Sequence, residues 1–287
     1  MPFRSPERHT ECAYYFPSGG PVIHPFLARF GTPFVLAVVV TLANAAKPVV
    51  VDDPAYLAFA AHIAAHPADP YGFDLYWYDA PDPAMDVLCP PVLPYWLAAG
   101  VRLVGVEPVL LKLWQFPFAW LLAWAVHDLL RRFARGTEAV ALPVVMLSPA
   151  VLPTVNLMLD IPAVALGLAA VAVFARSRGW PGVLLAGVLA GLAMQTKYSA
   201  LVAPAVVGWY GLTHRRVWPA IAAGVAAVAV FAGWECYVAA VSGKSHFLHH
   251  VAQQKPSANG WFVDKAALAA PLAAHLGLLG AGFALVA

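Results

Sequence analysis

Val51-Asp52-Asp53-Pro54-Ala55-Tyr56 opens a stretch of the chain that is rich in acidic side chains and has no basic ones. Between Pro48 and Val101 there is no lysine or arginine, and the same span holds seven aspartates: Asp52, Asp53, Asp69, Asp74, Asp79, Asp82 and Asp86. Most other segments of the chain are apolar. The stretch therefore predicts a water-facing loop carried by a largely apolar protein.

Composition indicates that lipid solvates much of this protein. Of its 287 residues, 61% are hydrophobic and only 11% are charged, and the mean hydropathy is +0.71. Soluble domains carry about 25% charged residues. The net charge of +2 gives no indication of nucleic-acid binding. The three cysteines have no metal-ligand spacing, and their odd number argues against a disulfide framework.

The apolar runs predict an all-α, polytopic transmembrane helical bundle with about eight spans. A spanning helix needs about 20 mainly apolar residues, and cytoplasmic loops are enriched in lysine and arginine. Residues 91–106 are expected to be interfacial or re-entrant, because a crossing there would place the basic cluster Arg131-Arg132-Phe133-Ala134-Arg135 outside. The expected spans are 30–50, 110–130, 140–157, 161–175, 181–194, 199–212, 217–237 and 266–287.

This map divides the chain into a cytoplasmic N-terminal extension, residues 1–28, and one transmembrane domain, residues 29–287. The extension lacks the early apolar core of a secretory signal. The last span has no basic anchor after it, which favours a longer parent protein. Extracytoplasmic loops are expected at 51–109, where interfacial helices are predicted, and at 238–265. The predicted location is the inner (cytoplasmic) membrane, with the acidic loop on the extracytoplasmic side.

Several polar groups lie close to the predicted membrane. Asp160 and Lys197 are costly at membrane depth, which favours a function for them, although they could also pair with each other or with the backbone. Glu235 is expected near the outer interface. His246, His249 and His250 form a cluster that suits a metal, a phosphate, an acceptor or an amphipathic loop. The Gly187-x-x-x-Gly191 spacing predicts close helix packing.

Four motifs occur in a fixed order. Asp52-Asp53-Pro54-Ala55-Tyr56 follows the first helix, and Cys89-Pro90-Pro91-Val92-Leu93-Pro94-Tyr95-Trp96-Leu97 follows in the same loop. Asp160-Ile161-Pro162 begins a helix, and Gly187 leads through Gly191 to Thr196-Lys197. Over residues 30–265 this order resembles the GT-C superfamily of membrane glycosyltransferases. The similarity is greatest to bacterial relatives of dolichyl-phosphate-mannose protein mannosyltransferase and of the lipid A aminoarabinose transferase.

The resemblance implies an enzyme that moves a sugar from a polyprenyl-phosphate donor to a hydroxyl of an extracytoplasmic lipid, glycan or protein. It implies that Asp52 is the general base and Asp53 its partner, one of the pair having a raised pKa. No cofactor is implied with certainty, and a divalent cation stays open. The implied substrate-binding residues are Tyr56, Tyr95, Arg102, Asp160, Lys197, His249 and His250.

The resemblance has one departure that concerns the donor phosphate. Cys89 stands where relatives often have a lysine that contacts this phosphate, so Lys197, Arg102 or Lys112 is expected to supply the positive charge. Three alternatives stay open at this point. Asp52 or Asp53 could cap the helix that begins at Pro54; the chain could be a secondary transporter that uses Asp160, Lys197 and Glu235; or it could be an inactive lipid-binding protein.

Overall fold

The computed structural model describes residues 25–50, 52–76 and 79–253, with side chains from residue 31 onward. This part of the chain is mainly helical. Its helices are α1 (Pro25–Ala45), α2 (Asp53–Ala65), α3 (Val92–Val104), α4 (Pro108–Trp114), α5 (Phe116–Phe133), α6 (Glu138–Met146), α7 (Asp160–Arg176), α8 (Trp180–Met194), α9 (Val202–Thr213), α10 (Val217–Ser242) and α11 (His246–Gln253).

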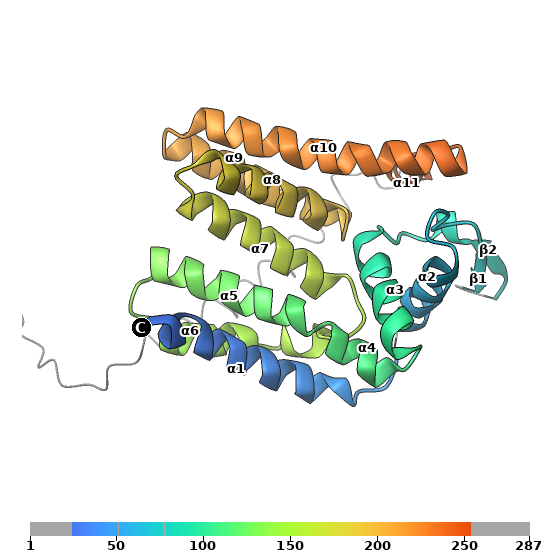
Figure 1. Cartoon of the computed structure of the whole chain (residues 1–287), viewed down its shortest axis with the longest axis horizontal. Helices are drawn as coiled ribbons and strands as arrows, with labels where there is room; N and C mark the ends of the chain where they lie inside the picture. The colour runs from blue at the N-terminus through green and yellow to red at the C-terminus, as the bar shows by residue number, and fades with distance from the viewer. Residues whose placement is uncertain (1–24, 51, 77–78, 254–287) are drawn as a thin grey trace, which may run out of the picture.

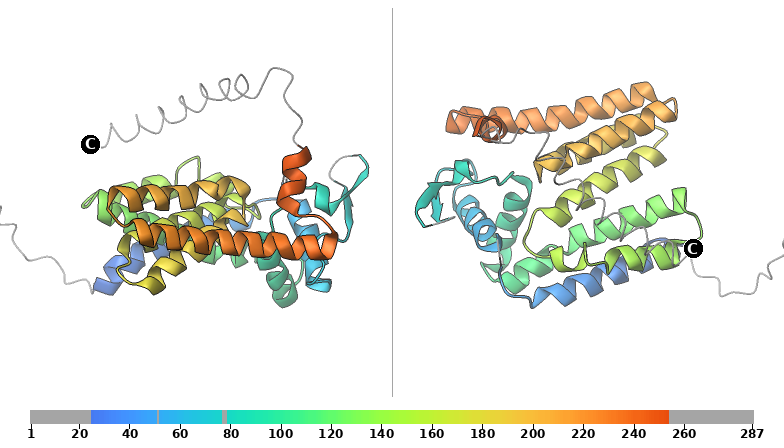
Figure 2. Two further views of the ribbon diagram at one scale, coloured as in Figure 1. Left: turned by 90° about the horizontal axis from the view of Figure 1, so that it is seen from above. Right: turned by 180° about the vertical axis from the view of Figure 1, so that it is seen from behind.

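The long helices lie side by side, and a smaller unit covers one end of them (Figure 1). The covering unit contains α2, α3 and a two-stranded ribbon of β1 (Asp74–Tyr76) and β2 (Pro81–Pro83). The strands are antiparallel, and Leu75 pairs with Asp82. Helix α11 follows α10 (Figure 2) and contacts a short 3-10 helix, Ala84–Asp86, that comes directly after β2.

One cluster of buried apolar side chains joins the covering unit to the bundle, and another lies within the bundle. In the covering unit, Phe59, Leu93 and Leu97 are fully buried together with Leu157 and Val238, which come from the bundle segments. This shared core fixes the acidic loop against the ends of α7 and α10. In the bundle, fully buried side chains of α1, α5 and α6 pack with those of α7.

Helix α8 packs closely on α10 through glycines. A Cβ atom on Gly187 would clash with the Ala223 carbonyl oxygen, and a Cβ atom on Gly191 would lie 2.7 Å from Val230 Cβ. This finding confirms the predicted packing role of the Gly187-x-x-x-Gly191 spacing.

Alanine at Gly187 is expected to destabilise the fold, because the new methyl group meets backbone that cannot rotate away. Overpacking of this kind typically costs about 1–3 kcal/mol. Gly208 in α9 is the matched control, since its Cβ position is open and alanine there should add up to about 1 kcal/mol through helix propensity. In thermal unfolding in detergent, the melting temperature should therefore fall for Gly187→Ala and rise for Gly208→Ala. A shift of both in the same direction would contradict this packing.

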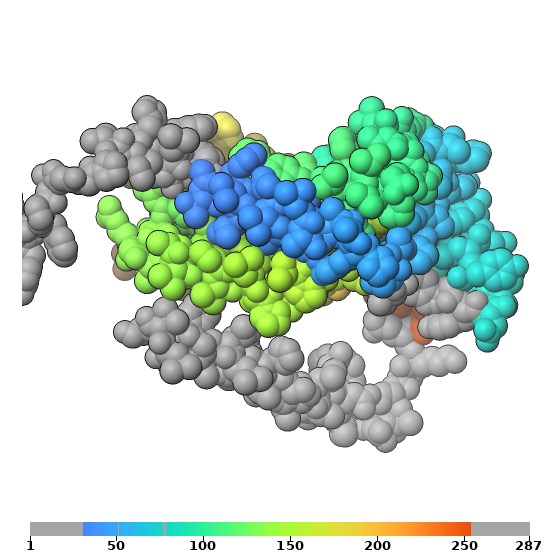
Figure 3. All heavy atoms as spheres, turned by 90° about the horizontal axis from the view of Figure 1, so that it is seen from below, coloured from blue at the N-terminus to red at the C-terminus, as the bar shows by residue number. Residues whose placement is uncertain are grey.

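Two helical segments within the described residues are long and apolar enough to cross a membrane: Pro108–Phe133, which combines α4 and α5, and Val217–Ser242. In Val217–Ser242, only 11% of the most apolar 18-residue stretch is buried, so most of this apolar surface faces outward. Helix α1 lies on the face seen in Figure 3, and its exposed apolar side chains include Val35 and Leu42. Apolar surface of this extent calls for a non-aqueous environment or a partner.

The count of eight spans is not confirmed. The expected span 140–157 is interrupted, because α6 ends at Met146 and a short 3-10 turn, Leu152–Thr154, follows it. Pro143 lies inside α6, and Pro149 and Pro153 follow it, so the backbone cannot continue a regular helix through this region. Residues 91–106 contain the 13-residue α3, which packs on α2. The expected span 266–287 and the extension 1–28 lie largely outside the described residues.

Candidate functional site

Four segments enclose a cavity of about 660 Å³ at the covered end of the bundle. They are the start of α2, the loop after β2, the start of α7 and the turn between α8 and α9. The lining residues thus lie at helix ends and in loops, where side chains do not have to pack between neighbouring helices. Its lining residues are Asp52, Tyr56, Asp82, Asp86, Val87, Leu88, Pro90, Met158, Leu159, Asp160, Lys197, Tyr198 and Ser199.

Asp52 lines this cavity with a half-buried side chain. It occupies the position before α2, yet its carboxylate makes no capping hydrogen bond to that helix. The helix-capping alternative therefore does not hold for Asp52. Pro54, the second residue of α2, has no backbone N–H, so the helix start needs one capping acceptor fewer.

Asp53 lies behind the cavity and is fully buried. Its carboxylate accepts hydrogen bonds from the backbone N–H of Val50, at 3.2 Å, and from that of Leu157, also at 3.2 Å. Burial raises the pKa of Asp53, while these N–H groups and the nearby charge of Lys112 oppose the rise. The bond from Leu157 joins the acidic loop to the segment before α7, and the bond from Val50 fixes the local turn, so Asp53 has a structural role in this arrangement.

Lys197 and Asp160 form an ion pair across the cavity, with 2.6 Å between Nζ and Oδ1. Asp160 is the first residue of α7, and Lys197 follows the end of α8. Both side chains are nearly half exposed, so the pair has access to a ligand and to water. An incoming anion could therefore compete with Asp160 for the ammonium group.

Two tyrosines add hydroxyl groups to the cavity wall. Burial raises the pKa of Tyr56 well above its ordinary value, and burial followed by the charge of Glu235 does the same for Tyr198. Both hydroxyls therefore keep their protons at physiological pH. They can donate hydrogen bonds to a ligand oxygen or to a neighbouring acceptor.

Tyr198 also belongs to a buried polar network centred on Glu235. One carboxylate oxygen of Glu235 accepts from Gln195, at 3.1 Å, and from the Tyr198 hydroxyl, at 3.2 Å. The other oxygen accepts from Ser245 Oγ, at 2.7 Å, and from the backbone N–H of Phe247, at 2.9 Å. Because its acceptor positions are occupied, Glu235 fixes α11 to the end of α10.

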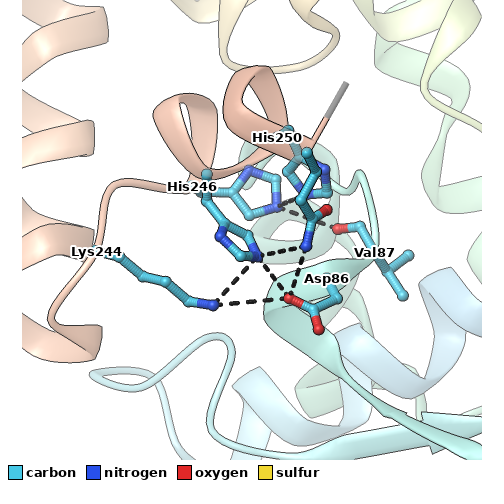
Figure 4. Close-up of polar contacts among 7 residues, drawn as sticks. Asp86, Val87, Lys244, His246 and His250 are labelled. Carbon is cyan, nitrogen blue, oxygen red and sulfur yellow. Dashed lines mark hydrogen bonds and ion pairs between the residues drawn. The ribbon is translucent and has the colours of Figure 1, made fainter. Parts of the chain in front are cut away.

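Asp86, which lines the cavity, connects the segment after β2 to α11 and to the turn before it, as Figure 4 shows. Its Oδ1 atom lies 2.6 Å from His249 Nε2, 3.7 Å from Lys244 Nζ and 3.4 Å from Gln253 Nε2. The hydrogen bond with His249 is the main cause of the lowered pKa of Asp86. Asp86 therefore stays ionised at neutral pH and holds α11 against the segment that follows β2.

His246, the first residue of α11, is fully buried. Its Nδ1 atom lies 2.6 Å from the Tyr198 hydroxyl, and its Nε2 atom lies 3.1 Å from the Val87 carbonyl oxygen. Its ring stacks on Tyr71, and His250 is a second ring nearby. Burial lowers the pKa of His246 to about 4.

Acidification should release α11, because the undocked imidazole binds a proton near pH 6.5 and the docked one does not until about pH 4. The free energy that favours docked α11 is therefore fully present above pH 6.5, and it falls by about 3 kcal/mol by pH 4. Hydrogen exchange of the α11 amides between pH 7 and pH 5 measures this loss. His246→Gln keeps a donor and an acceptor without titrating, so the added exchange should be greatly reduced; an unchanged pH profile in this variant would refute the assignment.

The remaining predicted site residues lie outside the cavity lining. The Tyr95 hydroxyl donates to the Pro67 carbonyl oxygen at 2.6 Å. The Arg102 guanidinium donates to the Ala64 carbonyl oxygen near the end of α2, at 2.6 and 2.9 Å. His249 pairs with Asp86, and His250 contacts His246. Of the residues predicted to contact substrate, the structure places Tyr56, Asp160 and Lys197 together with Asp52.

The cations expected to replace the missing lysine are also separated. Lys112 is buried and donates to the carbonyl oxygens of Lys47 and Pro48, and Arg102 caps α2. Cys89 is buried, and its carbonyl oxygen accepts from Tyr71. Lys197 is therefore the cation that lines the cavity among these three.

Sequence reasoning missed Tyr198 and underweighted Asp86. Tyr198 follows Lys197 directly, but only the fold shows that it contacts Glu235 and His246, which are distant in sequence. In sequence, Asp86 does not differ from the other loop aspartates, and its contact with His249 distinguishes it only in the structure. Pairings of this kind leave no local signal in the sequence.

Within the described residues, no group of three or more histidine, cysteine, aspartate or glutamate side chains is arranged to hold a metal ion. A comparison of the chain with models of protein families, with curated proteins and with solved structures finds no match.

Proposed function

We propose that this protein is an integral-membrane glycosyltransferase, which moves a sugar from a polyprenyl-phosphate donor to a hydroxyl of an extracytoplasmic acceptor. One observation carries the proposal: the polar cavity continues into an apolar groove. Asp160, Lys197 and Ser199 line both spaces. A ligand with a charged phosphate and a long apolar tail matches this sequence of surfaces.

The groove has a volume of about 480 Å³ and runs between α7 and α9. It begins at the Asp160–Lys197 ion pair and extends to Phe133 at the end of α5. Nearly all its other lining side chains are apolar, among them Val164 and Val206. The polyprenyl tail is proposed to lie here, which places its phosphate beside Lys197.

The chemistry follows from the groups around the cavity. The acceptor oxygen attacks the anomeric carbon, the bond from that carbon to the phosphate oxygen breaks, and polyprenyl phosphate leaves with the bonding electrons. Asp52 takes the proton of the acceptor hydroxyl as general base. Lys197 stabilises the leaving phosphate, and the protonated Tyr56 hydroxyl orients the sugar or the acceptor.

Two helical segments that are long and apolar enough to cross a membrane support this proposal. Helix α10 is apolar and mostly unburied, which distinguishes it from the core helix of a soluble protein. In the proposed topology the cavity faces the extracytoplasmic side, and the inner membrane surrounds α10 and the α4–α5 segment. The GT-C family resemblance in the loop motifs is consistent with this orientation.

The purified full chain in proteoliposomes tests the function with a polyprenyl-phosphate sugar labelled in the sugar. Transferase activity predicts that label becomes covalently bound to an acceptor from cell-envelope extract, with one polyprenyl phosphate released for each sugar transferred. Movement of label across the membrane with the donor intact would instead identify a transporter. Binding of the donor with neither outcome would leave a lipid-binding protein, and either result would overturn the proposal.

A further inference from the structure

A second polar cavity lies at the opposite end of α7 from the acidic one. Its volume is about 510 Å³, and its lining consists of Arg132, Ala175, Arg176, Ser177, Arg178 and Arg216. Helix α7 has 17 residues and therefore separates the two cavities by about 25 Å at 1.5 Å per residue. This distance is close to the thickness of the hydrocarbon core of a bilayer, about 30 Å.

The arginines come from three different places in the chain. Arg132 lies in the last turn of α5, Arg176 and Arg178 surround the turn from α7 to α8, and Arg216 precedes α10. No acidic residue lines this cavity. Four positive charges gathered from three segments repel one another unless an anion lies among them.

Internal contacts orient most of these guanidinium groups without neutralising them. Arg216 donates to the carbonyl oxygens of Phe174 and Ser177, and Arg132 donates to the Tyr210 hydroxyl at 2.6 Å. These acceptors carry no formal charge. Arg176 differs from these two, because its Nη1 atom lies 3.2 Å from a carboxylate oxygen of Asp128. Arg178 is exposed and has no hydrogen bond or ion pair with another described residue.

Exposed tryptophans at the same end supply an independent observation. Trp180 begins α8, Trp218 lies in the first turn of α10, and Trp209 lies in the last two turns of α9. All three are largely solvent-exposed in the isolated chain. Tryptophan side chains concentrate at the level of lipid headgroups, so this end of the bundle matches a membrane interface.

We infer that the arginine cavity binds the phosphate group of an anionic phospholipid. Guanidinium groups form bidentate, charge-assisted hydrogen bonds with phosphate oxygens. Basic pockets between helices at the cytoplasmic surface suit such headgroups. The acyl chains would extend along the exposed apolar surface of α9 and α10, where Leu212 and Ile221 are exposed. This inference does not depend on the proposed transferase activity.

Native mass spectrometry of the full chain, released from detergent with phosphatidylglycerol or phosphatidylcholine, tests the inference. One tightly held phosphatidylglycerol is expected, with phosphatidylcholine bound about tenfold or more weakly. The variant Arg132→Gln/Arg178→Gln should lose this preference. Arg131→Gln/Arg135→Gln is the matched control, because it removes the same charge from exposed arginines of the same region that do not line the cavity.

Retention of the preference in the control alone would support a built site. Equal losses in both variants would indicate diffuse surface attraction and overturn the inference. Inorganic phosphate forms the second arm: displacement of phosphatidylglycerol by millimolar phosphate would identify a soluble anion as the ligand and would also overturn it. Thermal unfolding of both variants in detergent checks that they remain folded. If Arg132→Gln/Arg178→Gln does not remain folded, the test is repeated with Arg178→Gln alone, which removes no internal contact.

Discussion

Asparagine at Asp52 is expected to lower sugar transfer by about 10²–10⁴-fold, the contribution typical of a general base. The variant keeps the size and polarity of the side chain but cannot accept the proton of the acceptor. Because Asp52 makes no capping hydrogen bond to α2, its stability should stay close to that of the native protein. The rate of label transfer at saturating donor measures the effect.

Asp74→Asn is the matched control for this prediction. Asp74 lies in β1 of the same acidic loop, is exposed and does not line the cavity. The substitution makes the same change in charge, so it separates general electrostatics of the loop from the role of Asp52. Equal activity of the two variants would remove Asp52 from the mechanism.

The substitution Asp53→Ala is expected to lower the stability of the protein strongly, for a structural reason. The substitution leaves the buried N–H group of Leu157 and the partly buried N–H group of Val50 without this acceptor, and it removes the negative charge near the buried Lys112. Losses of this type cost about 3 kcal/mol or more. The melting temperature should fall by roughly 6 °C or more for a chain of this size.

The pair of neighbouring aspartates thus gives opposite phenotypes. Asp53→Ala should lose stability, whereas Asp52→Asn should lose activity without melting earlier. Activity measured below the melting temperature of Asp53→Ala, relative to the folded fraction, should be largely retained. A loss of activity in fully folded Asp53→Ala would instead assign this residue to the chemistry.

Local features of the fold could be predicted from the sequence. The helix after the first acidic pair begins at Asp53, and a helix begins at Asp160, because proline in the first turn and apolar runs mark both starts. The Gly187–Gly191 spacing identified a close helix contact correctly. The interruption between α6 and α7 was not predicted, since hydropathy alone does not register how Pro143, Pro149 and Pro153 divide an apolar run.

The site was predictable in the same uneven way. The order of the motifs predicts Asp52, Tyr56, Asp160 and Lys197 as site residues, and all four line one cavity. The role of Asp53 could not be separated from that of Asp52, because burial depends on Leu157, 104 residues away. The arginine cavity was likewise hidden, since basic clusters in different loops indicate topology but not which of their side chains converge.

Cysteine accessibility at Leu88 tests the central claim, that the acidic cavity faces the extracytoplasmic side and holds the donor. Leu88 lines the cavity and is 54% exposed. Leu88→Cys, with Cys12 and Cys236 replaced by serine, should react with an impermeant maleimide added outside intact cells or right-side-out vesicles. The polyprenyl-phosphate sugar should slow this reaction severalfold, and it should leave the reaction of Asp74→Cys in the same background unchanged. Labelling of Leu88→Cys only from the cytoplasmic side, or at a rate the donor does not alter, would contradict the account.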